Sequence, residues 1–283
     1  MEAIRFGGKM NDRDERVAAL SNMVLYNSMN DKQYVDGAPH IKHRDIRELY
    51  GKLVVQVFDQ AKESVIVPNV LDLGAGEGSV TLPFLELGAK VTAVDISENQ
   101  LSALQNRCKR YGDSLEAQCM DISDFLSSTT PKYNIIVVNS FLHHIPDYLR
   151  LIRSAVTRLA PSGQFFAFQD PLRYDTVEKP TKLFSEMGYL VWRSRRGNIM
   201  RGVKTRIRRL RGIYSDEHEV DFAEYHVVRN GVDQNAIVAL LAEEGFDSTL
   251  IRYFSTQSPA FQFIGTRLGM KNKFGIIARK KEA

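Results

Sequence analysis

The chain has few cysteines and no long hydrophobic segment, and each absence excludes a class of protein. Its two cysteines, Cys108 and Cys119, are too few for a disulfide framework, a CxxC metal site or a three-cysteine iron–sulfur motif. No run of about 18 apolar residues occurs, so no membrane span is expected. The first residues, MEAIRFGGKMNDRDER, lack the apolar core of a signal peptide. We therefore expect a cytoplasmic protein with free thiols.

Acidic residues are absent from one basic segment. From Arg193 to Arg211 the sequence has nine Lys and Arg residues and no Asp or Glu. The remainder of the chain has 29 basic and 34 acidic residues, so the net charge of +4 is a local property of this segment. Apolar residues recur in it at helical spacing and predict an amphipathic helix with a basic face. They are Ile199, Val203, Ile207, Leu210 and Tyr214.

Strand and helix patterns alternate through most of the chain. The expected strands are Asn69–Leu73, Lys90–Asp95, Leu115–Met120, Tyr133–Val138, Gln164–Gln169, Thr249–Ser255 and Phe274–Arg279. Helices are expected at about His43–Lys62, Ser79–Leu87, Ser97–Tyr111, Pro146–Leu159 and Gln234–Glu244, with a short one within 259–269. This alternation predicts an α/β fold, a doubly wound, seven-stranded and mostly parallel sheet. The last strand follows its predecessor too soon for a full crossover, so we expect it to be antiparallel.

The most informative motif joins the first strand to the next helix. Residues 70–78 read VLDLGAGEG, so a strand runs directly into Gly74, Gly76 and Gly78. Glycine lets the backbone turn sharply and approach a ligand closely. Asp95 ends the next strand about 20 residues later, where an acid can bind the hydroxyls of a ribose. The motif therefore predicts a nucleotide-like ligand at this edge of the sheet.

The spacing and charge of this loop distinguish two such ligands. A dinucleotide site has the spacing G-x-G-x-x-G, whereas this chain has the closer G-x-G-x-G. Asp72 and Glu77 place two carboxylates at the loop, and these would repel a pyrophosphate. They suit a ligand that carries an ammonium and a sulfonium group, such as S-adenosylmethionine.

Three further segments follow in order: AVDIS, CMDISDF and NSFLHHIPD. Together with DLGAGEG they resemble the successive cofactor motifs of class I S-adenosylmethionine-dependent methyltransferases of small molecules, over roughly residues 68–170. The resemblance implies a Rossmann-like methyltransferase fold, S-adenosylmethionine as cofactor and S-adenosylhomocysteine as product. It assigns the glycine loop to the methionine and ribose, and the next two acids to the ribose hydroxyls and the adenine amino group. The implied cofactor residues are Asp72, Gly74, Gly76, Gly78, Asp95, Ile96, Asp121, Ile122 and Asn139.

For Asp95 and Asp121 a helix-capping role remains the alternative. The fourth of these segments, NSFLHH, also differs from the [DN]-P-P-[YF] motif typical of DNA methyltransferases that modify exocyclic amines. This difference disfavours methylation of a nucleic acid base.

We expect four parts in the chain. Residues 1–64 are predicted to form an N-terminal lid and helix, and residues 65–170 the cofactor-binding half of the core. Residues 171–228 interrupt the alternation and are predicted to be an inserted substrate cap. Residues 229–283 complete the core.

Histidines are the expected catalytic residues, because methylation of a hydroxyl requires removal of a proton and imidazoles are the usual bases near neutral pH. His144, which follows the fourth strand, is the first choice. His226, Tyr225 and His40 are the other catalytic candidates, and packing is the alternative role for each. Substrate contacts are expected from Tyr34, His143, Asp170, Arg206 and Arg209. Asn139 and Asp170 are too few oxygen ligands for a metal site, so no metal is expected.

The function predicted from these features is O-methylation of a small molecule, with a phosphate-bearing or carrier-linked sugar or natural-product intermediate as the favoured substrate. N-methylation, or methylation of RNA or a lipid, is the alternative. Alternatives from other classes are a nicotinamide-dependent oxidoreductase and a non-catalytic binding protein. The basic segment fits a solvated helix face, a site for an anionic substrate, or peripheral contact with a membrane. Nucleic acid is disfavoured, because no recognition module is present. The oligomeric state is left open.

Overall fold

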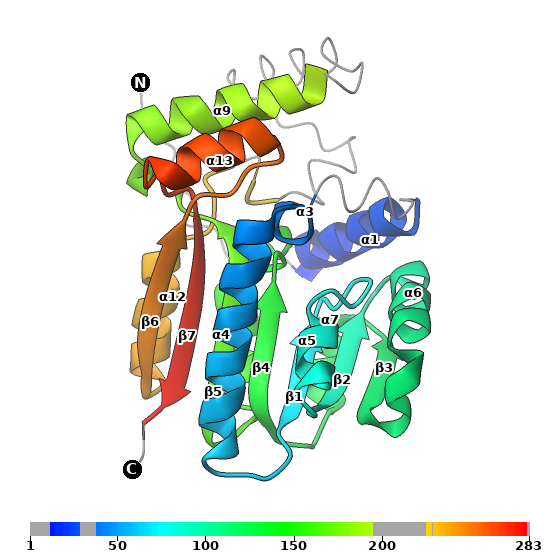
Figure 1. Ribbon diagram of the computed structural model, residues 1–283. Coiled ribbons are helices and arrows are strands. Elements are labelled where there is room, and N and C mark those ends of the chain that lie inside the picture. The colour runs from blue at the N-terminus through cyan, green and yellow to red at the C-terminus, as the bar shows by residue number, and fades with distance from the viewer. Residues whose placement is uncertain (1–11, 29–37, 195–224, 228, 282–283) are drawn as a thin grey trace.

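The computed structural model describes residues 12–28, 38–194, 225–227 and 229–281, and Figure 1 shows a central sheet covered by helices on both faces. The strand order is β3-β2-β1-β4-β5-β7-β6. The strands are β1 (Asn69–Leu73), β2 (Lys90–Asp95), β3 (Leu115–Cys119), β4 (Tyr133–Asn139), β5 (Leu159–Pro171), β6 (Phe246–Tyr253) and β7 (Lys273–Lys280). β7 is antiparallel to both of its neighbours, β5 and β6, and the pairs among β1 to β5 are parallel. The predicted fold, including the antiparallel last strand, is confirmed.

The helices form two layers against the sheet and a group beyond its carboxyl edge. They are α1 (Asp12–Ser28), α3 (Pro39–Lys42), α4 (Arg44–Lys62), α5 (Thr81–Glu86), α6 (Glu98–Cys108), α7 (Ile122–Ser128), α8 (Tyr148–Val156), α9 (Lys179–Ser194), α12 (Gln234–Glu243) and α13 (Pro259–Arg267). Short 3₁₀ turns lie at Lys109–Ser114, Leu142–His144 and Tyr174–Thr176. In Figure 1, α1, α3, α9 and α13 all lie at the upper end of the sheet, where the parallel strands end.

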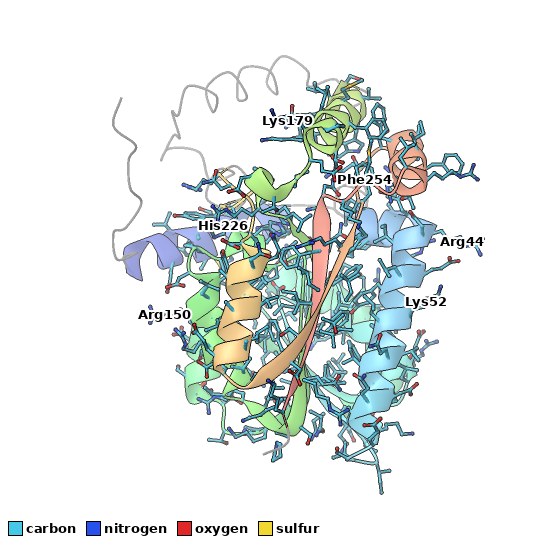
Figure 2. All side chains as sticks on the ribbon, turned by 90° about the vertical axis from the view of Figure 1, so that its left-hand side faces the viewer. Arg44, Lys52, Arg150, Lys179, His226 and Phe254 are labelled. Carbon is cyan, nitrogen blue, oxygen red and sulfur yellow. The ribbon has the colours of Figure 1, made fainter. Side chains whose placement is uncertain are left out.

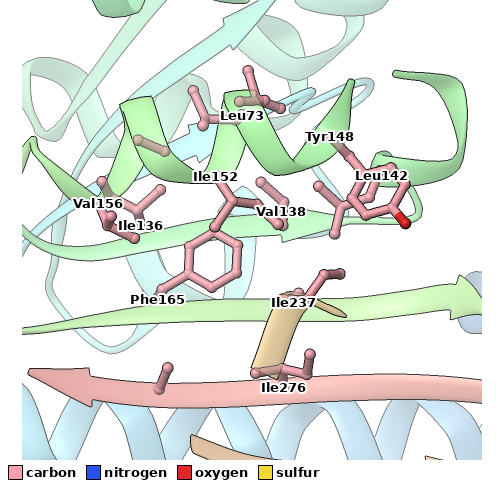
Figure 3. Packing of buried hydrophobic residues seen from close by; sticks show 14 of the residues in the cluster. Leu73, Ile136, Val138, Leu142, Tyr148, Ile152, Val156, Phe165, Ile237 and Ile276 are labelled. Atoms are coloured by element: carbon pink, nitrogen blue, oxygen red, sulfur yellow. The ribbon is translucent and has the colours of Figure 1, made fainter. Parts of the chain in front are cut away.

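The sheet is buried on both faces because successive residues of its central strands point in opposite directions. On β5, Phe165 packs in the cluster with α7, α8 and α12, whereas Phe166 packs in the cluster with α4 and α5. Both rings are fully buried. Figure 3 shows Phe165 beside Ile152 of α8 and Ile136 of β4. The two cores hold the strands in register and so fix the positions of the residues at their ends.

Four helices, α1, α3, α7 and α9, were given no bounds from the sequence, although a helical lid was expected at the N-terminus. α1 lies in residues 1–42, which contain several glycines and prolines. The stretch from Lys9 to Asp36, however, contains no glycine and no proline, and α1 forms within it. α9 lies in the region expected to be an insertion, and it packs on α13 through Gly188, where a Cβ atom would lie 3.0 Å from the Phe261 ring. β6 begins at Phe246 instead of Thr249, because Phe246, Asp247 and Ser248 pair with Lys280, Arg279 and Ala278 of β7 although two of the three are polar.

The chain leaves and re-enters the core at one point at the end of β5. Leu172 forms a parallel bridge with Val232, and the Tyr174 amide donates to the Asn230 carbonyl at 2.8 Å. Gly231 has a φ of +73°, and a Cβ atom there would lie 2.3 Å from the Leu172 carbonyl oxygen. The backbone therefore passes too closely at this point to accept a side chain.

Among the helices of the described ranges, none combines the length and apolar character needed to cross a membrane.

Candidate functional site

The glycine loop after β1 lies against the ends of two other strands. The amides of Gly74 and Ala75 both donate to the Val94 carbonyl of β2, at 2.9 and 3.1 Å. Gly74 has a φ of +76°, and a Cβ atom there would lie 2.3 Å from the ring of Phe141, which follows β4. Gly76 and Gly78 also have positive φ values. The loop thus requires glycine for both conformation and space.

Asp95 joins the glycine loop to the turn after β2. Its Oδ2 accepts from the Gly76 amide and its Oδ1 from the Ser97 amide, both at 2.8 Å. Burial raises the pKa of Asp95, and these amides oppose the rise. Each carboxylate oxygen can accept a second hydrogen bond. The side chain is only partly buried, so Asp95 and its neighbour Ile96 remain accessible to a ligand at this edge.

Asp72 is a fully buried carboxylate directly before the glycine loop. Its Oδ2 accepts from the Thr81 hydroxyl at 2.6 Å, and its Oδ1 has no partner among the described residues. Burial, together with the charge of Asp95, raises the pKa of Asp72 to about 7. A buried carboxylate with one unsatisfied oxygen is suited to a cationic or hydrogen-bonding ligand.

Asp121 ends the turn after β3 and caps α7. Its Oδ1 accepts from the amides of Ser123 and Asp124, at 2.8 and 3.4 Å, while Oδ2 makes no hydrogen bond to a described residue. Ile122 is buried in the core cluster of α7 and α8. The capping role weighed from the sequence is therefore present, and Oδ2 is left available to a ligand.

Asn139 ends β4 at the same edge. Its side chain is buried, and Oδ1 has no partner among the described residues. The following residue, Ser140, has a φ of +53° and donates its amide to the Phe168 carbonyl of β5 at 2.7 Å. This backbone turn sends the chain across the edge toward two adjacent histidines.

His143 forms a buried pair with Asp170, the acid near the end of β5. Asp170 Oδ1 lies 2.7 Å from His143 Nδ1 and accepts from the His143 amide at 3.0 Å. Asp170 Oδ2 is buried and has no partner among the described residues. Burial raises the pKa of Asp170 to about 6, against the opposing effects of the His143 amide and of the charges of Lys273 and His144.

His144 contacts a residue of the N-terminal helix. The hydroxyl of Tyr26 on α1 lies 3.0 Å from His144 Nε2, and the two rings meet edge to face. The ring of His144 also lies 4.0 Å, between centroids, from that of His143. His144 therefore lies between Tyr26 of α1 and the pair formed by His143 and Asp170.

The end of α1 is fixed to the turn after β2. Ser97 Oγ donates to Asn27 Oδ1 at 2.6 Å, and Asn99 Nδ2 donates to the Asn27 carbonyl at 2.9 Å. α1 thus crosses the edge from the Asp95 turn to His144. The sequence predicted an N-terminal lid without a residue that could hold it, because both contacts join positions far apart in the chain.

His226 lies beside the histidine loop but is engaged with its backbone. Its amide donates to the His143 carbonyl at 2.8 Å, and its Nε2 donates to the carbonyls of Ile145 and Pro146, at 3.0 and 3.1 Å. Burial lowers the pKa of His226. Figure 2 shows His226 near the upper end of α12. Its Nε2 proton is thus held by the loop, and Nδ1 alone could accept a proton.

Tyr225 lies next to His226, and its ring is covered by the guanidinium of Arg229 at 3.7 Å from the centroid. Its carbonyl accepts from Arg229 at 2.8 Å. Tyr225 is therefore packed against a cation and against the ring of His226.

His40 and Lys273 complete this side of the edge. His40 Nδ1 is buried and has no partner among the described residues, and burial together with the charge of Lys273 lowers the pKa of His40 to about 4. Lys273 begins β7, paired with Pro171 of β5, and its charge also acts on Asp170. Lys273 was missed by the sequence analysis. The predicted antiparallel direction of β7 could have identified it, because an antiparallel strand begins at the edge of the sheet where the parallel strands end.

Three of the expected substrate residues lie outside the described residues: Tyr34, Arg206 and Arg209. Within the described residues there is no group of three or more His, Cys, Asp and Glu side chains that could hold a metal ion. The edge can nevertheless bind a polar ligand at Asp72, Asp95 and Asn139 and exchange a proton at the histidine pair beside them.

Comparison with known proteins supports a relationship along this part of the chain. Residues 42–206 match a family described as "Methyltransferase domain". A ubiquinone biosynthesis O-methyltransferase of Coxiella burnetii is 32% identical over 98 residues, which cover 35% of this chain and 42% of that protein. The enzyme of the same name from Actinobacillus pleuropneumoniae serotype 5b is 28% identical over 140 residues, covering 48% of this chain and 57% of that protein. The chain thus spans about half the length of these curated relatives.

Solved structures share the fold at low sequence identity. The N-methyltransferase NodS from Bradyrhizobium japonicum, in complex with S-adenosylhomocysteine, has a TM-score of 0.54 and 16% identity, over 94% of this chain and 99% of that one. Magnesium protoporphyrin IX methyltransferase from Synechocystis PCC 6803 has a TM-score of 0.54 and 14% identity, over 92% and 100%. These likenesses concern the fold alone.

Proposed function

The chain belongs to the family of methyltransferase domains and is an S-adenosylmethionine-dependent methyltransferase, and we propose that it methylates a hydroxyl group of a small molecule. Family membership sets aside the alternatives of a nicotinamide-dependent oxidoreductase and of a non-catalytic binding protein. The curated relatives named above are O-methyltransferases, which supports oxygen as the acceptor atom. The substrate and the residue roles below are part of the proposal.

The described residues fit S-adenosylmethionine. Asp72 Oδ1 and Asn139 Oδ1 are buried acceptors without partners among the described residues. These acceptors complement a ligand with positive charge, whereas a pyrophosphate would be repelled. In this proposal Asp95 receives the ribose hydroxyls, and Asp121 Oδ2 with Ile122 receives the adenine. The cofactor, when bound, supplies a methyl group activated by a cationic sulfur.

The contact between Tyr26 and His144 carries the assignment of the acceptor side. A hydroxyl is a weak nucleophile, so a base must remove its proton as the new bond to carbon forms. The Tyr26 hydroxyl lies 3.0 Å from His144 Nε2 and so orients the ring, which also lies against His143, the partner of Asp170. We assign His144 as the base, with Tyr26 holding its ring in place.

The pair of His143 and Asp170 contacts His144 through the ring of His143. Asp170 fixes the His143 ring through its Nδ1 atom, and the His143 ring lies against His144 at 4.0 Å between centroids. We assign His143 and Asp170 to positioning and to contacts with the polar part of the substrate. His40 is assigned to the substrate side through Lys273, which acts on both His40 and Asp170.

His226 and Tyr225 have a smaller part in this proposal than we predicted from their positions in the sequence. The Nε2 proton of His226 is shared with two carbonyls of the histidine loop, so we assign His226 to fixing that loop. Tyr225 packs against Arg229. Tyr34, Arg206 and Arg209 keep their proposed roles at the substrate, as contacts for an anionic or carrier-linked group.

Transfer of label from radioactive S-adenosylmethionine into a fractionated cell extract tests the proposal. Polar metabolites, lipids, protein and nucleic acid are counted separately, and the His144→Gln variant is the matched control. We expect label in the metabolite or lipid fraction, stable to mild acid and base as an ether is, and a loss of about 100-fold or more in the variant. Binding of S-adenosylhomocysteine by the variant must be unchanged. Label in nucleic acid or protein would overturn the substrate class.

A further inference from the structure

Two neighbouring helices, α9 and α13, lie beyond the carboxyl edge of the sheet (Figure 1), and both expose large apolar side chains. Leu183 of α9 is 61% exposed, and Leu268, directly after α13, is 64% exposed. We call these six exposed side chains, three from α9 and three from α13 and the residue after it, the α9–α13 apolar face. Its members are Leu183, Met187, Leu190, Phe263, Ile264 and Leu268. Exposed apolar side chains that recur on one side of a helix mark interaction sites more often than isolated ones do.

The packing of the two helices does not use this face. Leu183, Met187 and Leu190 recur at steps of four and three residues, so they lie on one side of α9. The buried residues Thr181 and Gly188 lie on the opposite side, where α9 meets α13. The contact between the helices is aromatic, with the rings of Phe184 and Phe261 4.7 Å apart. The α9–α13 apolar face is therefore additional to the contacts that hold the helices together.

Basic residues outnumber acidic ones on the two helices. Within residues 179–194 and 259–271 the sequence has five basic residues and one acid, Glu186. The basic residues are Lys179, Lys182, Arg193, Arg267 and Lys271. The guanidinium of Arg267 lies 4.3 Å from the centroid of the Phe263 ring, so cation and apolar surface are in direct contact. The segment directly after α9 continues the positive charge, since residues 193–211 contain no acid.

This combination of surfaces fits one kind of partner. Apolar side chains with a basic rim are the features by which proteins lie in the interface of an anionic bilayer, with Lys and Arg at the phosphates and apolar groups at the acyl boundary. A second copy of the chain fits less well, because two-fold pairing would bring the same basic rim of each copy against the other. We propose that the α9–α13 apolar face docks on an anionic lipid surface.

Docking through the α9–α13 apolar face would turn the carboxyl edge of the sheet toward the lipid. Figure 2 shows Lys179 of α9 at the top of the molecule, and His226 between it and the body of the sheet. A protein docked through α9 and α13 presents its carboxyl edge, with the histidine pair, toward the lipid. A substrate with an apolar tail would then reach the edge without leaving the membrane. Docking goes beyond the proposed methylation and is measured without any turnover.

Sedimentation of the full-length protein with vesicles tests the proposal. One set of vesicles contains phosphatidylcholine alone, and the other contains phosphatidylcholine and phosphatidylglycerol in equal parts. We expect binding to the anionic vesicles, and weaker binding when salt is raised from about 0.1 M to about 1 M, which shortens the Debye length from about 10 Å to about 3 Å. Absence of binding to the anionic vesicles at the lower salt would overturn the proposal.

Two matched double variants identify the surface. Leu183→Gln with Met187→Gln removes apolar area from the face, while Ile66→Gln with Val67→Gln removes a similar area from the loop between α4 and β1, at the opposite edge (Figure 1). The first is expected to weaken vesicle binding by about tenfold or more, and the second by less than about twofold. Circular dichroism and thermal melts check that both fold. Equal losses in the two variants, or a dimer in light scattering that only the first variant abolishes, would contradict docking on lipid.

Discussion

His143 and Asp170 form a buried pair in which the Asp170 carboxylate accepts from both the ring Nδ1 and the backbone amide of His143. One carboxylate oxygen thus fixes the orientation of the ring and of the loop that carries it. The arrangement resembles a base and its orienting acid, in which the carboxylate sets the tautomer of the imidazole. Because the ring of His144 contacts that of His143, the His143–Asp170 pair can position His144, the proposed base, without contacting the substrate itself.

Replacing Asp170 with asparagine is expected to lower kcat while leaving cofactor affinity unchanged. The amide has the size of the carboxylate, and its oxygen can still accept from both N–H groups, but it lacks the negative charge that stabilises a protonated imidazole. We expect kcat to fall by about tenfold or more, with the Kd for S-adenosylhomocysteine within about twofold of the original. The measurements are steady-state kinetics and calorimetric titration. A parallel loss of cofactor affinity would show that Asp170 acts on the cofactor site instead.

Tyr26 and His144 are expected to act as a unit. Tyr26→Phe removes the hydroxyl that lies 3.0 Å from Nε2 and keeps the edge-to-face ring contact. If the hydroxyl acts only through His144, the double variant with His144→Gln will be no slower than His144→Gln alone. The measurement is a double-mutant cycle on kcat. Additive losses would contradict the coupling and would assign Tyr26 a contact of its own with the substrate.

The strands of the cofactor half could be predicted from the sequence because their apolar runs have sharp ends. β1 and β2 have the predicted bounds, Asn69–Leu73 and Lys90–Asp95. A parallel strand buried on both faces reads as continuous apolar sequence, and the polar residue that follows it lies at the ligand edge. Asp95, Asn139 and Asp170 were therefore predicted at that edge from their positions after strands.

The partners of these residues could not be predicted. Tyr26 and His144 are separated by 118 positions, and no local pattern relates a tyrosine on one helix to a histidine in a distant loop. The engagement of His226 with the carbonyls of Ile145 and Pro146 is equally non-local. The sequence does not distinguish a histidine whose ring nitrogen is hydrogen-bonded to a backbone carbonyl from one whose ring nitrogen is available to a substrate.

Asp72→Asn is expected to change the pH dependence of stability. Burial raises the pKa of Asp72 to about 7 from 3.8, so the folded protein binds an additional proton between these values. Stability contributed by that proton is present below pH 4 and is lost as pH rises through 7. Asparagine removes this loss, so thermal melts at pH 8 should show a Tm higher by about 2–4 °C, with little difference at about pH 4. A variant less stable at pH 8 would show that the carboxylate is compensated by contacts beyond Thr81.

The same variant is expected to bind the cofactor more weakly. Removing a charged partner from a buried hydrogen bond costs about 1.5–3 kcal/mol, so the Kd for S-adenosylhomocysteine should rise by about tenfold or more. Higher stability with lower affinity would separate the binding role of Asp72 from any role in folding. Unchanged affinity would contradict the assignment of its unsatisfied oxygen to the cofactor.

Gly74→Ala tests the close approach of the glycine loop to the loop after β4. The added Cβ atom would lie 2.3 Å from the Phe141 ring, in a backbone conformation with a φ of +76° that non-glycine residues rarely adopt. The conformational part costs about 1–2 kcal/mol, and the overlap with the ring adds to it. We expect loss of S-adenosylhomocysteine binding and a lower Tm.

A second substitution separates the two causes. In the double variant Gly74→Ala with Phe141→Ala the overlap is gone and the φ strain remains. Gly74→Ala should therefore lower Tm less in the Phe141→Ala background than it does in the original protein. Gly51→Ala is the control, because nothing lies within 4 Å of its Cβ position in α4 and alanine favours a helix by about 1 kcal/mol. It should raise Tm and leave binding unchanged. Recovery of neither stability nor binding in the double variant would mean that the backbone conformation of Gly74, and not the space beside Phe141, is what the loop requires.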